Sequence, residues 1–245
     1  MPTTVYVCLP AYNEETSLAQ LFDEYITLLE KPSYPYKLIL VNDGSTDRTA
    51  EIAQSYQSKL PLEILTHNPN RGLGEAIRTG FHHVVSVAKE TDVIVYMDSD
   101  NTHDPIYIPS MVKKIEEGFD VVIASRYQPG SEERGVPFSR RLLSRTAGYV
   151  FRLFLPVRGV KDYTCGYRAY RAGLIKEAIE KYNHHFITAK GFACTDEILI
   201  KLSQLTNKMA EVPFILYYDR KKGDSKLNLW KTIPATLHLL WTRGK

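Results

Sequence analysis

Short apolar segments recur along the first half of the chain, and each is bounded by polar turns. Five of them, rich in β-branched residues, read as strands: 5–9, 38–41, 62–66, 93–97 and 121–124. Apolar residues at helical spacing lie between them: 17–29, 46–57, 75–87 and 105–117. The last of these segments begins at Asp104-Pro105, a capping carboxylate followed by a proline. Because strands buried on both faces read as continuous apolar runs, this alternation predicts an α/β fold with a mostly parallel central sheet flanked by helices.

The alternation of strands and helices ends after residue 124. A basic helix is predicted over 139–155, followed by two more helices and a strand near 210–217. No repeat or low-complexity linker divides the chain, so we expect one domain over 1–217 and a basic loop with an amphipathic helix over 218–245. Trp230 and Trp241 recur there with leucines near helical spacing, beside basic residues. This pattern suits a helix in a membrane interface; packing on the domain core or on a partner subunit is the alternative.

Composition narrows the class of protein. With 44% hydrophobic and 24% charged residues, the 245-residue chain is neither disordered nor fibrous. No apolar run approaches the roughly 18 residues of a transmembrane helix. The polar N-terminus does not resemble a signal peptide. Cys8, Cys165 and Cys194 lack metal-ligand spacing and are expected to be free thiols in a reducing cytosol, so we expect a cytoplasmic protein.

Charge is distributed unevenly along the chain. The formal net charge is +3, but residues 1–119 carry 9 basic and 17 acidic side chains. Residues 120–175 carry 10 basic and 4 acidic side chains, and residues 217–245 carry 7 and 2. The acidic first half is unsuited to nucleic acid but can hold a divalent cation, whereas the basic segments can meet phosphates or an anionic membrane.

Polar residues follow three of the predicted strands, at 10–15, 42–47 and 98–100. In open α/β sheets, ligands bind at the carboxyl ends of the strands. Asp98 and Asp100 are alternate residues of an extended chain, so both carboxylates can face one hard cation such as Mg²⁺ or Mn²⁺. Such an ion completes its shell with water and phosphates, which indicates a nucleotide diphosphate as ligand. A dinucleotide-binding dehydrogenase is a weaker interpretation, because the glycine-rich segment 72–77 ends in isoleucine instead of glycine.

These motifs resemble the inverting family 2 glycosyltransferases of GT-A fold, in particular the dolichyl- and polyprenyl-phosphate mannose synthases. Residues 9–14 resemble the family's nucleotide-binding start, and 42–47 resemble its Asp-Asp-x-Ser-x-Asp element. Residues 70–74 resemble its glycine-rich loop, and 98–100 its metal-binding Asp-x-Asp. The residues thereby implied to bind the nucleotide sugar are Pro10, Tyr12, Asn13, Glu14, Asn42, Asp43, Gly72 and Asp98, with Asp43 reading the base.

Later motifs resemble the synthases more narrowly. The resemblance implies that Arg126, Ser139 and Arg140 hold the phosphate of a lipid acceptor. The segment 220–226 is similar to the family's loop over the pyrophosphate, which implies that Arg220 and Lys226 close over the donor.

The chain also departs from the synthase pattern at two positions. Thr102 and Thr195 stand where the synthases commonly carry glutamines, and the first of these glutamines joins the metal shell. Thr102 is therefore a candidate third metal ligand after Asp98 and Asp100, and the donor sugar is left open.

The chemistry of sugar transfer assigns roles to these residues. The leaving diphosphate must be neutralised and the nucleophile held in line. A lipid phosphate is already anionic near neutral pH and needs only cations to position it. A sugar hydroxyl would need a base, for which Asp196 is the candidate; the alternative is that Asp196 caps a helix over 197–205.

The resemblance implies GDP-mannose as the first donor to consider and UDP-glucose or another UDP-hexose as the next. It implies polyprenyl or dolichyl phosphate as acceptor, peripheral contact with a membrane and a possible membrane subunit as partner. A non-catalytic, membrane-associated module that binds nucleotide sugars is the alternative of another class. The histidine pairs 82–83 and 184–185 are expected on the surface, whereas His103 either supports the acidic motif or caps a turn.

Overall fold

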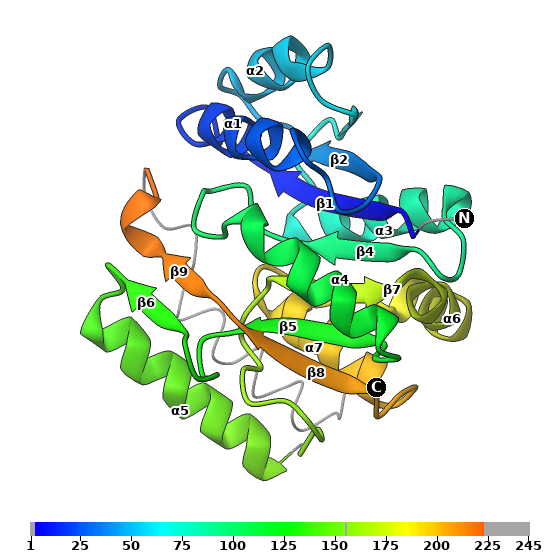
Figure 1. The fold of residues 1–245 in the computed structure, drawn as a ribbon, viewed down its shortest axis with the longest axis vertical. Coiled ribbons are helices and arrows are strands. Elements are labelled where there is room, and N and C mark those ends of the chain that lie inside the picture. Colours follow the sequence, from blue (N-terminus) through cyan, green and yellow to red (C-terminus); the bar gives the residue numbers. More distant parts are fainter. Residues whose placement is uncertain (1–2, 155, 223–245) are drawn as a thin grey trace.

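A computed structural model describes residues 3–154 and 156–222. Its centre is a seven-stranded sheet with the order β3-β2-β1-β4-β7-β5-β8 (Figure 1). The strands are β1 (Val5–Ala11), β2 (Tyr36–Asn42), β3 (Leu62–Thr66), β4 (Val93–Tyr96), β5 (Val121–Ser125), β7 (Arg168–Arg171) and β8 (Met209–Pro213). β7 is antiparallel to β4 and β5, and the other pairs in this sheet are parallel. The predicted mostly parallel α/β fold is confirmed.

Seven helices accompany the strands in the described ranges. They are α1 (Leu18–Leu29), α2 (Thr49–Tyr56), α3 (Leu73–Val87), α4 (Ile108–Glu116), α5 (Phe138–Phe154), α6 (Ala172–Tyr182) and α7 (Ala193–Ser203). α3, α6 and α7 pack on one face of the sheet, and α1, α2 and α4 lie on the other (Figure 1). Asp104 accepts a hydrogen bond from the backbone N–H of Ile106 at 3.0 Å, so the capping carboxylate predicted there is confirmed.

β7 was not predicted, because its sequence Arg-Ala-Tyr-Arg is not an apolar run. Arg168 nevertheless lies fully buried, and its guanidinium donates to the carbonyls of Tyr163 and Thr195, both at 2.5 Å. These hydrogen bonds offset part of the free-energy cost of moving the charged guanidinium out of water. The antiparallel insertion carries residues 162–167 into the centre of the molecule.

The single strand predicted near 210–217 is two strands in two sheets. β8 ends at Pro213, and β9 (Ile215–Tyr217) pairs in parallel with β6 (Glu132–Arg134). Phe214 between them is 1% exposed and packs edge-on against His103, Tyr107 and Tyr167. The buried aromatic ring at this bend turns the chain out of the main sheet toward α5.

Several smaller predictions can be compared with the structure. Cys8, Cys165 and Cys194 are buried free thiols, as expected. Within 3–154 and 156–222, no helix combines the length and apolar character needed to cross a bilayer. Of the predicted C-terminal segment 218–245, the structure describes the short turn η3 (Tyr218–Arg220) and the two lysines after it. The amphipathic helix predicted there, with Trp230 and Trp241, and the predicted donor residue Lys226 lie outside the described residues.

Candidate active site

The loops that follow β1, β2 and β4 meet at one edge of the sheet. These strands are neighbours in parallel pairing, so their carboxyl ends lie together. The Ser99 hydroxyl donates to the carbonyl of Pro10 at 2.9 Å, which ties the end of β4 to the end of β1. The Asn13 N–H donates to the Ser45 hydroxyl at 3.0 Å, which ties β1 to β2. The predicted convergence of the three polar motifs is therefore present.

Two asparagines shape this edge. Asn13 adopts a φ of 51°, and its side-chain oxygen accepts the backbone N–H of Thr46 at 2.8 Å. The Asn42 side-chain oxygen accepts the N–H of Ser45 at 3.0 Å. Asparagine tolerates the left-handed region and hydrogen-bonds nearby backbone, which suits it to such turns. Tyr12 is 37% exposed beside them, where a flat ligand could reach its ring.

Asp43 anchors the glycine-rich loop. Its Oδ1 accepts from His67 Nδ1 at 2.6 Å and from the N–H of Arg71 at 2.9 Å. Its Oδ2 accepts from Asn70 Nδ2 and from the N–H of Gly72, both at 2.8 Å. The protein's own donors thus engage both carboxylate oxygens, and base reading by Asp43 stays a prediction. His67 was not predicted, because a single histidine in a sequence does not by itself indicate a binding or structural role.

Asp98 and Asp100 lie at the centre of the converging loops. The Tyr96 hydroxyl donates to Asp98 Oδ1 at 3.1 Å. Asp100 Oδ1 accepts from the Thr102 hydroxyl at 2.6 Å, and Asp100 Oδ2 accepts from the ammonium of Lys221. Burial raises the pKa of the Asp98 carboxyl. Burial also acts to raise the pKa of Asp100, but the charge and hydrogen bond of Lys221 outweigh it and hold that pKa below its usual range.

This arrangement fits a cation that is shared with a ligand. The Lys221 ammonium lies against Asp100, so the acid pair already attracts one positive charge. No cluster of three or more acidic, histidine or cysteine side chains that could hold a metal occurs within the described ranges. Mg²⁺ is commonly held by one or two carboxylates together with water and phosphate oxygens. Asp98 and Asp100 fit that role, and ligation by Thr102 stays a prediction because its hydroxyl donates to Asp100 here.

Lys221 was not predicted, because it lies in a run of basic residues without a distinguishing feature. Its neighbour Arg220 contacts other acids: Nη1 lies 3.1 Å from Glu24 Oε1 and 3.4 Å from Asp104 Oδ2. The guanidinium also lies 3.7 Å from the centre of the Tyr217 ring. The structure thus brings Lys221 onto the acid pair, and the role of Arg220 at the diphosphate stays a prediction.

His103 supports the backbone of the acid pair. It is buried, stacks on the ring of Tyr167, and its Nδ1 accepts the N–H of Asp98 at 3.2 Å. Burial lowers its pKa, which favours the neutral ring that this acceptor role requires. The histidine therefore holds the turn after β4.

A second group of charges surrounds Arg126. Its Nε and Nη2 donate to the two oxygens of the buried Asp162 at 2.8 and 2.6 Å, and Nη2 also donates to the Thr164 hydroxyl at 2.7 Å. Burial acts to lower the pKa of Arg126, but the charge of Asp162 outweighs it and raises that pKa above its usual value. The two-point pairing fixes the guanidinium plane.

Glu133 lies between Arg126 and Arg141. Its Oε1 is 3.9 Å from Arg126 Nη1, and its Oε2 is 3.3 Å from Arg141 Nε. The Glu133 side chain is 8% exposed, yet among the described residues neither Glu133 Oε1 nor Arg141 Nε has a hydrogen-bond partner. Two guanidinium groups therefore converge on one imperfectly bonded anion.

The predicted acceptor residues Arg140 and Ser139 do not join this cluster in the structure. Arg140 lies 5.3 Å from the centre of the Tyr218 ring, and Ser139 is exposed near the start of α5. Their contact with an acceptor phosphate stays a prediction. Arg141 is the residue of this helix that the structure pairs with Arg126 through Glu133.

Asp196 lies inside the first turn of α7, which begins at Ala193. The alternative that Asp196 caps a helix over 197–205 is therefore wrong. Asp196 is 5% exposed, and its charge and that of Asp98 both contribute to the raised pKa of the Cys194 thiol, whose main cause is burial. Cys194 at the start of α7 thus lies within electrostatic range of both Asp196 and Asp98.

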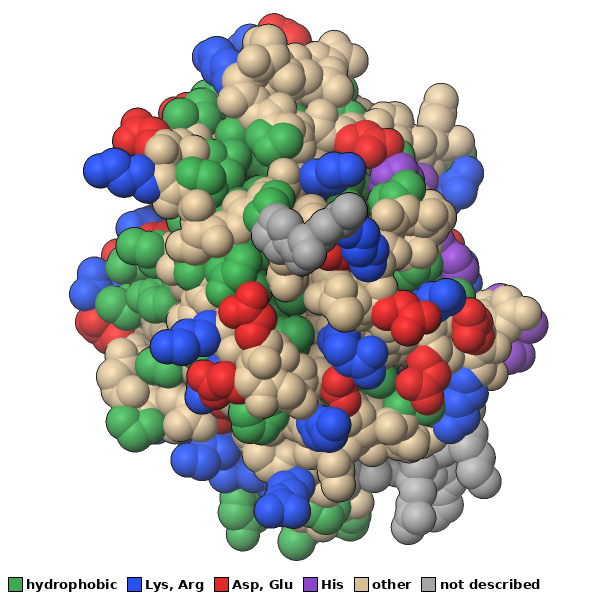
Figure 2. Space-filling view, turned by 45° about the vertical axis from the view of Figure 1, so that its right-hand side comes forward, with side chains coloured by type: hydrophobic (Ala, Val, Ile, Leu, Met, Phe, Trp, Pro, Cys, Tyr) green, Lys and Arg blue, Asp and Glu red, His purple; other side chains and the backbone are tan. Residues whose placement is uncertain are grey.

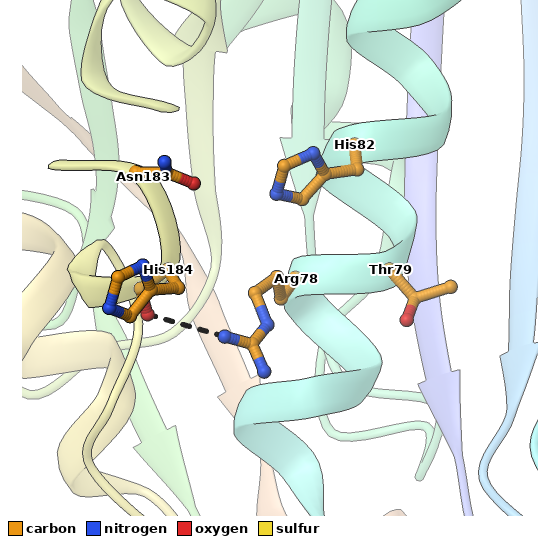
Figure 3. Close-up of a pocket in the computed structure, with 5 residues that line it drawn as sticks. All are labelled: Arg78, Thr79, His82, Asn183 and His184. Carbon is orange, nitrogen blue, oxygen red and sulfur yellow. Dashed lines mark hydrogen bonds between the residues drawn. The ribbon is translucent and has the colours of Figure 1, made fainter. Parts of the chain in front are cut away.

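A small pocket lies away from these residues, between α3 and the turn η2 (Asn183–His185). Its volume is about 430 Å³, and it is lined by Arg78, Thr79, His82, Asn183 and His184 (Figure 3). Arg78 donates to the carbonyl of His184 at 3.3 Å across it. The histidine pairs 82–83 and 184–185 are exposed or half-buried, as expected. No predicted site residue lines this pocket.

Comparison with known proteins identifies the family. The sequence pattern described as "Glycosyl transferase family 2" matches residues 6–179. The chain therefore belongs to glycosyl transferase family 2, as the resemblance of its motifs predicted.

Three curated relatives extend this match. A dolichol-phosphate mannosyltransferase of Pyrococcus furiosus is 37% identical over 91% of this chain and 59% of its own length. A polyprenol monophosphomannose synthase of Mycolicibacterium smegmatis is 30% identical over 91% of this chain and 80% of its own. An undecaprenyl-phosphate 4-deoxy-4-formamido-L-arabinose transferase of Edwardsiella ictaluri is 30% identical over 96% of this chain and 66% of its own. The chain thus spans little more than half of the Pyrococcus relative.

Solved structures share the fold. Glucosyl-3-phosphoglycerate synthase from Mycobacterium tuberculosis, solved with Mn²⁺, UDP and phosphoglyceric acid, superposes with a TM-score of 0.70. It is 20% identical, over 99% of this chain and 78% of the other. A second structure of that enzyme, with Mg²⁺ and UDP, gives a TM-score of 0.67 at 21% identity, over 99% of this chain and 79% of the other. The GT-A type of fold is confirmed.

Proposed function

We propose that this family 2 glycosyltransferase moves a hexose from a nucleotide-diphosphate sugar to polyprenyl or dolichyl phosphate, with GDP-mannose as donor. The names of all three relatives contain a polyprenol phosphate, and two of them name mannose. The observation that carries the proposal is the acid pair Asp98 and Asp100 at the end of β4. Asp100 contacts the Lys221 ammonium, at the edge of the sheet where β1 and β2 also end.

The donor occupies this edge. Asp98 and Asp100 hold Mg²⁺ or Mn²⁺, which when bound neutralises charge on the leaving diphosphate. Lys221 is placed to contact the same diphosphate, because its ammonium already lies against Asp100. The loops that Asn13, Asn42 and Asp43 organise form the walls of the nucleotide site.

The acceptor phosphate binds where Arg126 and Arg141 converge. A phosphomonoester carries more than one negative charge near neutral pH, so it can attack the sugar without a general base. Arg126 is held rigidly by Asp162, and its Nη1 faces Glu133, an anion that a phosphate could replace. Guanidinium forks suit phosphate in two-point contact, so these arginines position the nucleophile.

A second candidate function keeps the fold and changes the substrates. In it, a UDP-hexose is the donor, a sugar hydroxyl is the acceptor, and Asp196 removes the proton of that hydroxyl. The burial of Asp196 in the first turn of α7 supports this candidate, because the charge of Asp98 reaches Cys194 in the same turn. The lipid acceptor of the first candidate requires the protein to work at a membrane surface. We place the protein there as a peripheral protein on the cytoplasmic face, alone or with a membrane subunit.

The test is a transfer assay with the full chain. Purified protein with Mg²⁺ or Mn²⁺ receives labelled GDP-mannose or UDP-glucose, and either polyprenyl phosphate or a soluble sugar. We expect organic-soluble label from GDP-mannose, abolished by Asp100→Asn and retained in the exposed control Glu51→Gln. Water-soluble product lost in Asp196→Asn would support the second candidate. Nucleotide-sugar binding without turnover of any donor would leave a non-catalytic binding module and overturn both.

A further inference from the structure

Helix α5 exposes large apolar side chains to solvent. The exposed fractions are 78% for Phe138, 55% for Leu142, 66% for Tyr149 and 67% for Leu153. Phe154 at the end of the helix is 64% exposed. Across the rest of the described ranges, the exposed large apolar side chains are Tyr12 (37%), Val87 (54%) and Ile106 (66%), which lie on separate elements. The concentration on one helix therefore needs an explanation.

The exposed side chains form one stripe along the helix. At 3.6 residues per turn, positions 138, 142, 149 and 153 fall within roughly 60° of one another. Arg141, Arg145 and Arg152 fall along one border of this stripe at the same spacing. We refer to Phe138, Leu142, Tyr149 and Leu153 with these three arginines as the α5 outer face.

The inner side of α5 is attached to the domain. Phe151 is fully buried and stacks on the ring of Tyr163 with centroids 5.3 Å apart. The Ser144 hydroxyl lies 3.0 Å from that of Thr164. At the border of the outer face, Arg141 donates to the carbonyl of Glu133 at 3.3 Å. The helix is thus held in one orientation, and its outer face is presented to the surroundings.

The segment that carries this face has charge of a single sign. Residues 138–161 contain no acidic side chain. Their basic side chains are Arg140, Arg141, Arg145, Arg152, Arg158 and Lys161. Figure 2 shows hydrophobic and basic side chains together at the foot of the molecule, the height at which α5 lies in Figure 1. A helix with an apolar stripe beside arginines matches the interface of a bilayer that contains anionic lipids.

We propose that the α5 outer face is the surface by which this protein lies on an anionic lipid bilayer. The apolar stripe enters the boundary between headgroups and acyl chains, and Arg141, Arg145 and Arg152 meet the lipid phosphates. The proposal extends the proposed function, because a polyprenyl phosphate presents its phosphate at this level. Arg141 then belongs both to the membrane face and to the cluster with Arg126 and Glu133, so the acceptor phosphate reaches that cluster without leaving the membrane surface.

Two protein occupants compete with the bilayer, and charge disfavours both. Residues 223–245 carry Lys226, Lys231, Arg243 and Lys245 against the single acid Asp224. A second copy of α5 would bring arginines against arginines in a two-fold contact. Anionic lipid instead complements both segments.

The first test is sedimentation of the full chain with vesicles of phosphatidylcholine, with and without phosphatidylglycerol. The variant Leu142→Ser/Tyr149→Ser/Leu153→Ser is expected to bind at least about tenfold more weakly to both kinds of vesicle. Arg145→Ala/Arg152→Ala should weaken binding to the anionic vesicles alone, and salt should do the same to the wild type. The control Val87→Ser/Ile106→Ser removes exposed apolar side chains elsewhere and should bind as the wild type. Equal binding by the triple variant and the wild type would overturn the proposal.

The second test identifies what covers the face. Because the native cysteines are buried, a dye sensitive to polarity can be attached to an introduced cysteine in Tyr149→Cys, with Ile106→Cys as the matched control. We expect a blue shift on anionic vesicles at position 149 and none at 106. A blue shift without vesicles would identify a protein occupant and overturn the proposal. Dependence on protein concentration would then indicate a second copy, and independence the segment 223–245.

Transfer assays separate this proposal from the proposed function. The triple variant should retain activity toward a short, water-soluble prenyl phosphate and lose activity toward a long acceptor in bilayers. If no variant and no wild-type protein transfers sugar, the proposed function fails, while the two binding tests still decide the membrane face. Circular dichroism of the triple variant confirms that the helix remains folded.

Discussion

Lys221 and Asp100 form the ion pair that dominates the electrostatics of the candidate active site. Their side chains are 15% and 11% exposed, so water screens the pair only in part. The charge of Asp100 is also the main reason why the pKa of Lys221 is raised in spite of its burial. The ammonium donates to Asp100 Oδ2, so a divalent cation would compete with it for that oxygen.

Removal of this ammonium should therefore help a metal ion and hinder a diphosphate. In Lys221→Ala, we expect the nucleotide-free protein to bind Mn²⁺ about tenfold more tightly, equivalent to about 1.4 kcal/mol. The affinity for a nucleoside diphosphate should fall by a similar factor. Calorimetric titration with each ligand measures both changes, and Lys222→Ala, its exposed neighbour, is the control. Unchanged Mn²⁺ affinity would show that Lys221 does not compete with the metal.

Asp162 and Arg126 form a buried ion pair, and its contribution to the free energy of unfolding should depend on pH. Burial acts to raise the pKa of Asp162, but the charge and hydrogen bonds of Arg126 hold it below its usual value. A lowered folded-state pKa stabilises the protein above the unfolded value of about 3.9, and this stability is lost as pH falls through the folded value. Asp162→Asn leaves Arg126 buried without its partner, so we expect a loss of about 3–5 kcal/mol at neutral pH.

Urea unfolding over a series of pH values measures this difference. The gap in unfolding free energy between wild type and Asp162→Asn should begin to narrow below about pH 4, where the carboxyl takes up a proton in the unfolded chain but not yet in the folded protein. It should go on narrowing until the pH reaches the lowered folded-state pKa of Asp162. A gap that stays constant as pH falls well below about 4 would contradict the assignment of a charged Asp162.

Arg141 and Arg140 offer a direct comparison of structure and sequence. The motif implied Arg140 as a phosphate ligand, whereas the structure directs Arg141 toward Arg126 through Glu133. Arg141→Ala should raise the KM for the polyprenyl phosphate about 10- to 100-fold, the value of one charge-assisted hydrogen bond of about 1.5–3 kcal/mol. Arg140→Ala should raise it less. Steady-state kinetics with varied acceptor decides, and a larger effect of Arg140→Ala would restore the motif's assignment.

At the scale of elements, the apolar pattern correctly predicted those strands and helices whose residue types follow from burial in the core. The predicted strands at 5–9, 38–41 and 121–124 correspond to β1, β2 and β5, whose residues are almost all buried. The helices agree within a few residues at their ends. These elements bury apolar side chains on a regular period, which a sequence displays directly.

The remaining elements depend on tertiary contacts that no local pattern displays. β7 begins with Arg168, whose burial is possible because the carbonyls of Tyr163 and of the more distant Thr195 accept its N–H groups. The strand predicted near 210–217 divides because Phe214 packs under His103 and Tyr167. α7 begins before Asp196, so a residue with high capping preference lies inside the helix.

α7 also holds the neighbouring loop through a buried ion pair. Glu197 accepts from the backbone N–H groups of Thr188 and Ala189 at 2.7 and 2.8 Å and from Lys201 Nζ at 2.7 Å. The Glu197 and Lys201 side chains are each 1% exposed. The Ala189 carbonyl oxygen in turn lies 2.9 Å from the point that a Cβ atom at Gly74 would occupy. Glu197 therefore fixes the distance between this loop and the start of α3.

Glu197→Ala should consequently destabilise the protein by about 3–5 kcal/mol. It leaves the buried Lys201 ammonium with the His185 carbonyl but without a counter-charge, and two backbone N–H groups without their acceptor. Denaturant unfolding measures the loss. The exposed Glu177→Ala on α6 is the control and should change stability by less than about 0.5 kcal/mol. A small loss in Glu197→Ala would mean that water replaces the carboxylate.

At the scale of the whole molecule, the uneven charge of the sequence corresponds to two sides of one site. The acidic first part supplies Asp98 and Asp100, and the later part supplies Arg126, Arg141 and Lys221. The position of the acid pair was predictable because both residues follow a buried strand. The partners of Arg126 and the identity of Lys221 were not, since they depend on how residues far apart in sequence pack together.

This division predicts that metal and nucleotide bind together. Two carboxylates alone form an incomplete shell for Mg²⁺ or Mn²⁺, and the phosphates of a nucleotide would complete it. Mn²⁺ alone and GDP alone should each raise the melting temperature slightly, whereas both together should raise it by more than the sum. A ligand at 100 times its Kd stabilises the folded state by about 2.7 kcal/mol, which is readily measured. Asp98→Asn should abolish the excess and leave the small effect of GDP. Additive shifts in the wild type would mean that the acid pair does not join metal to diphosphate, and the proposed donor site would then be wrong.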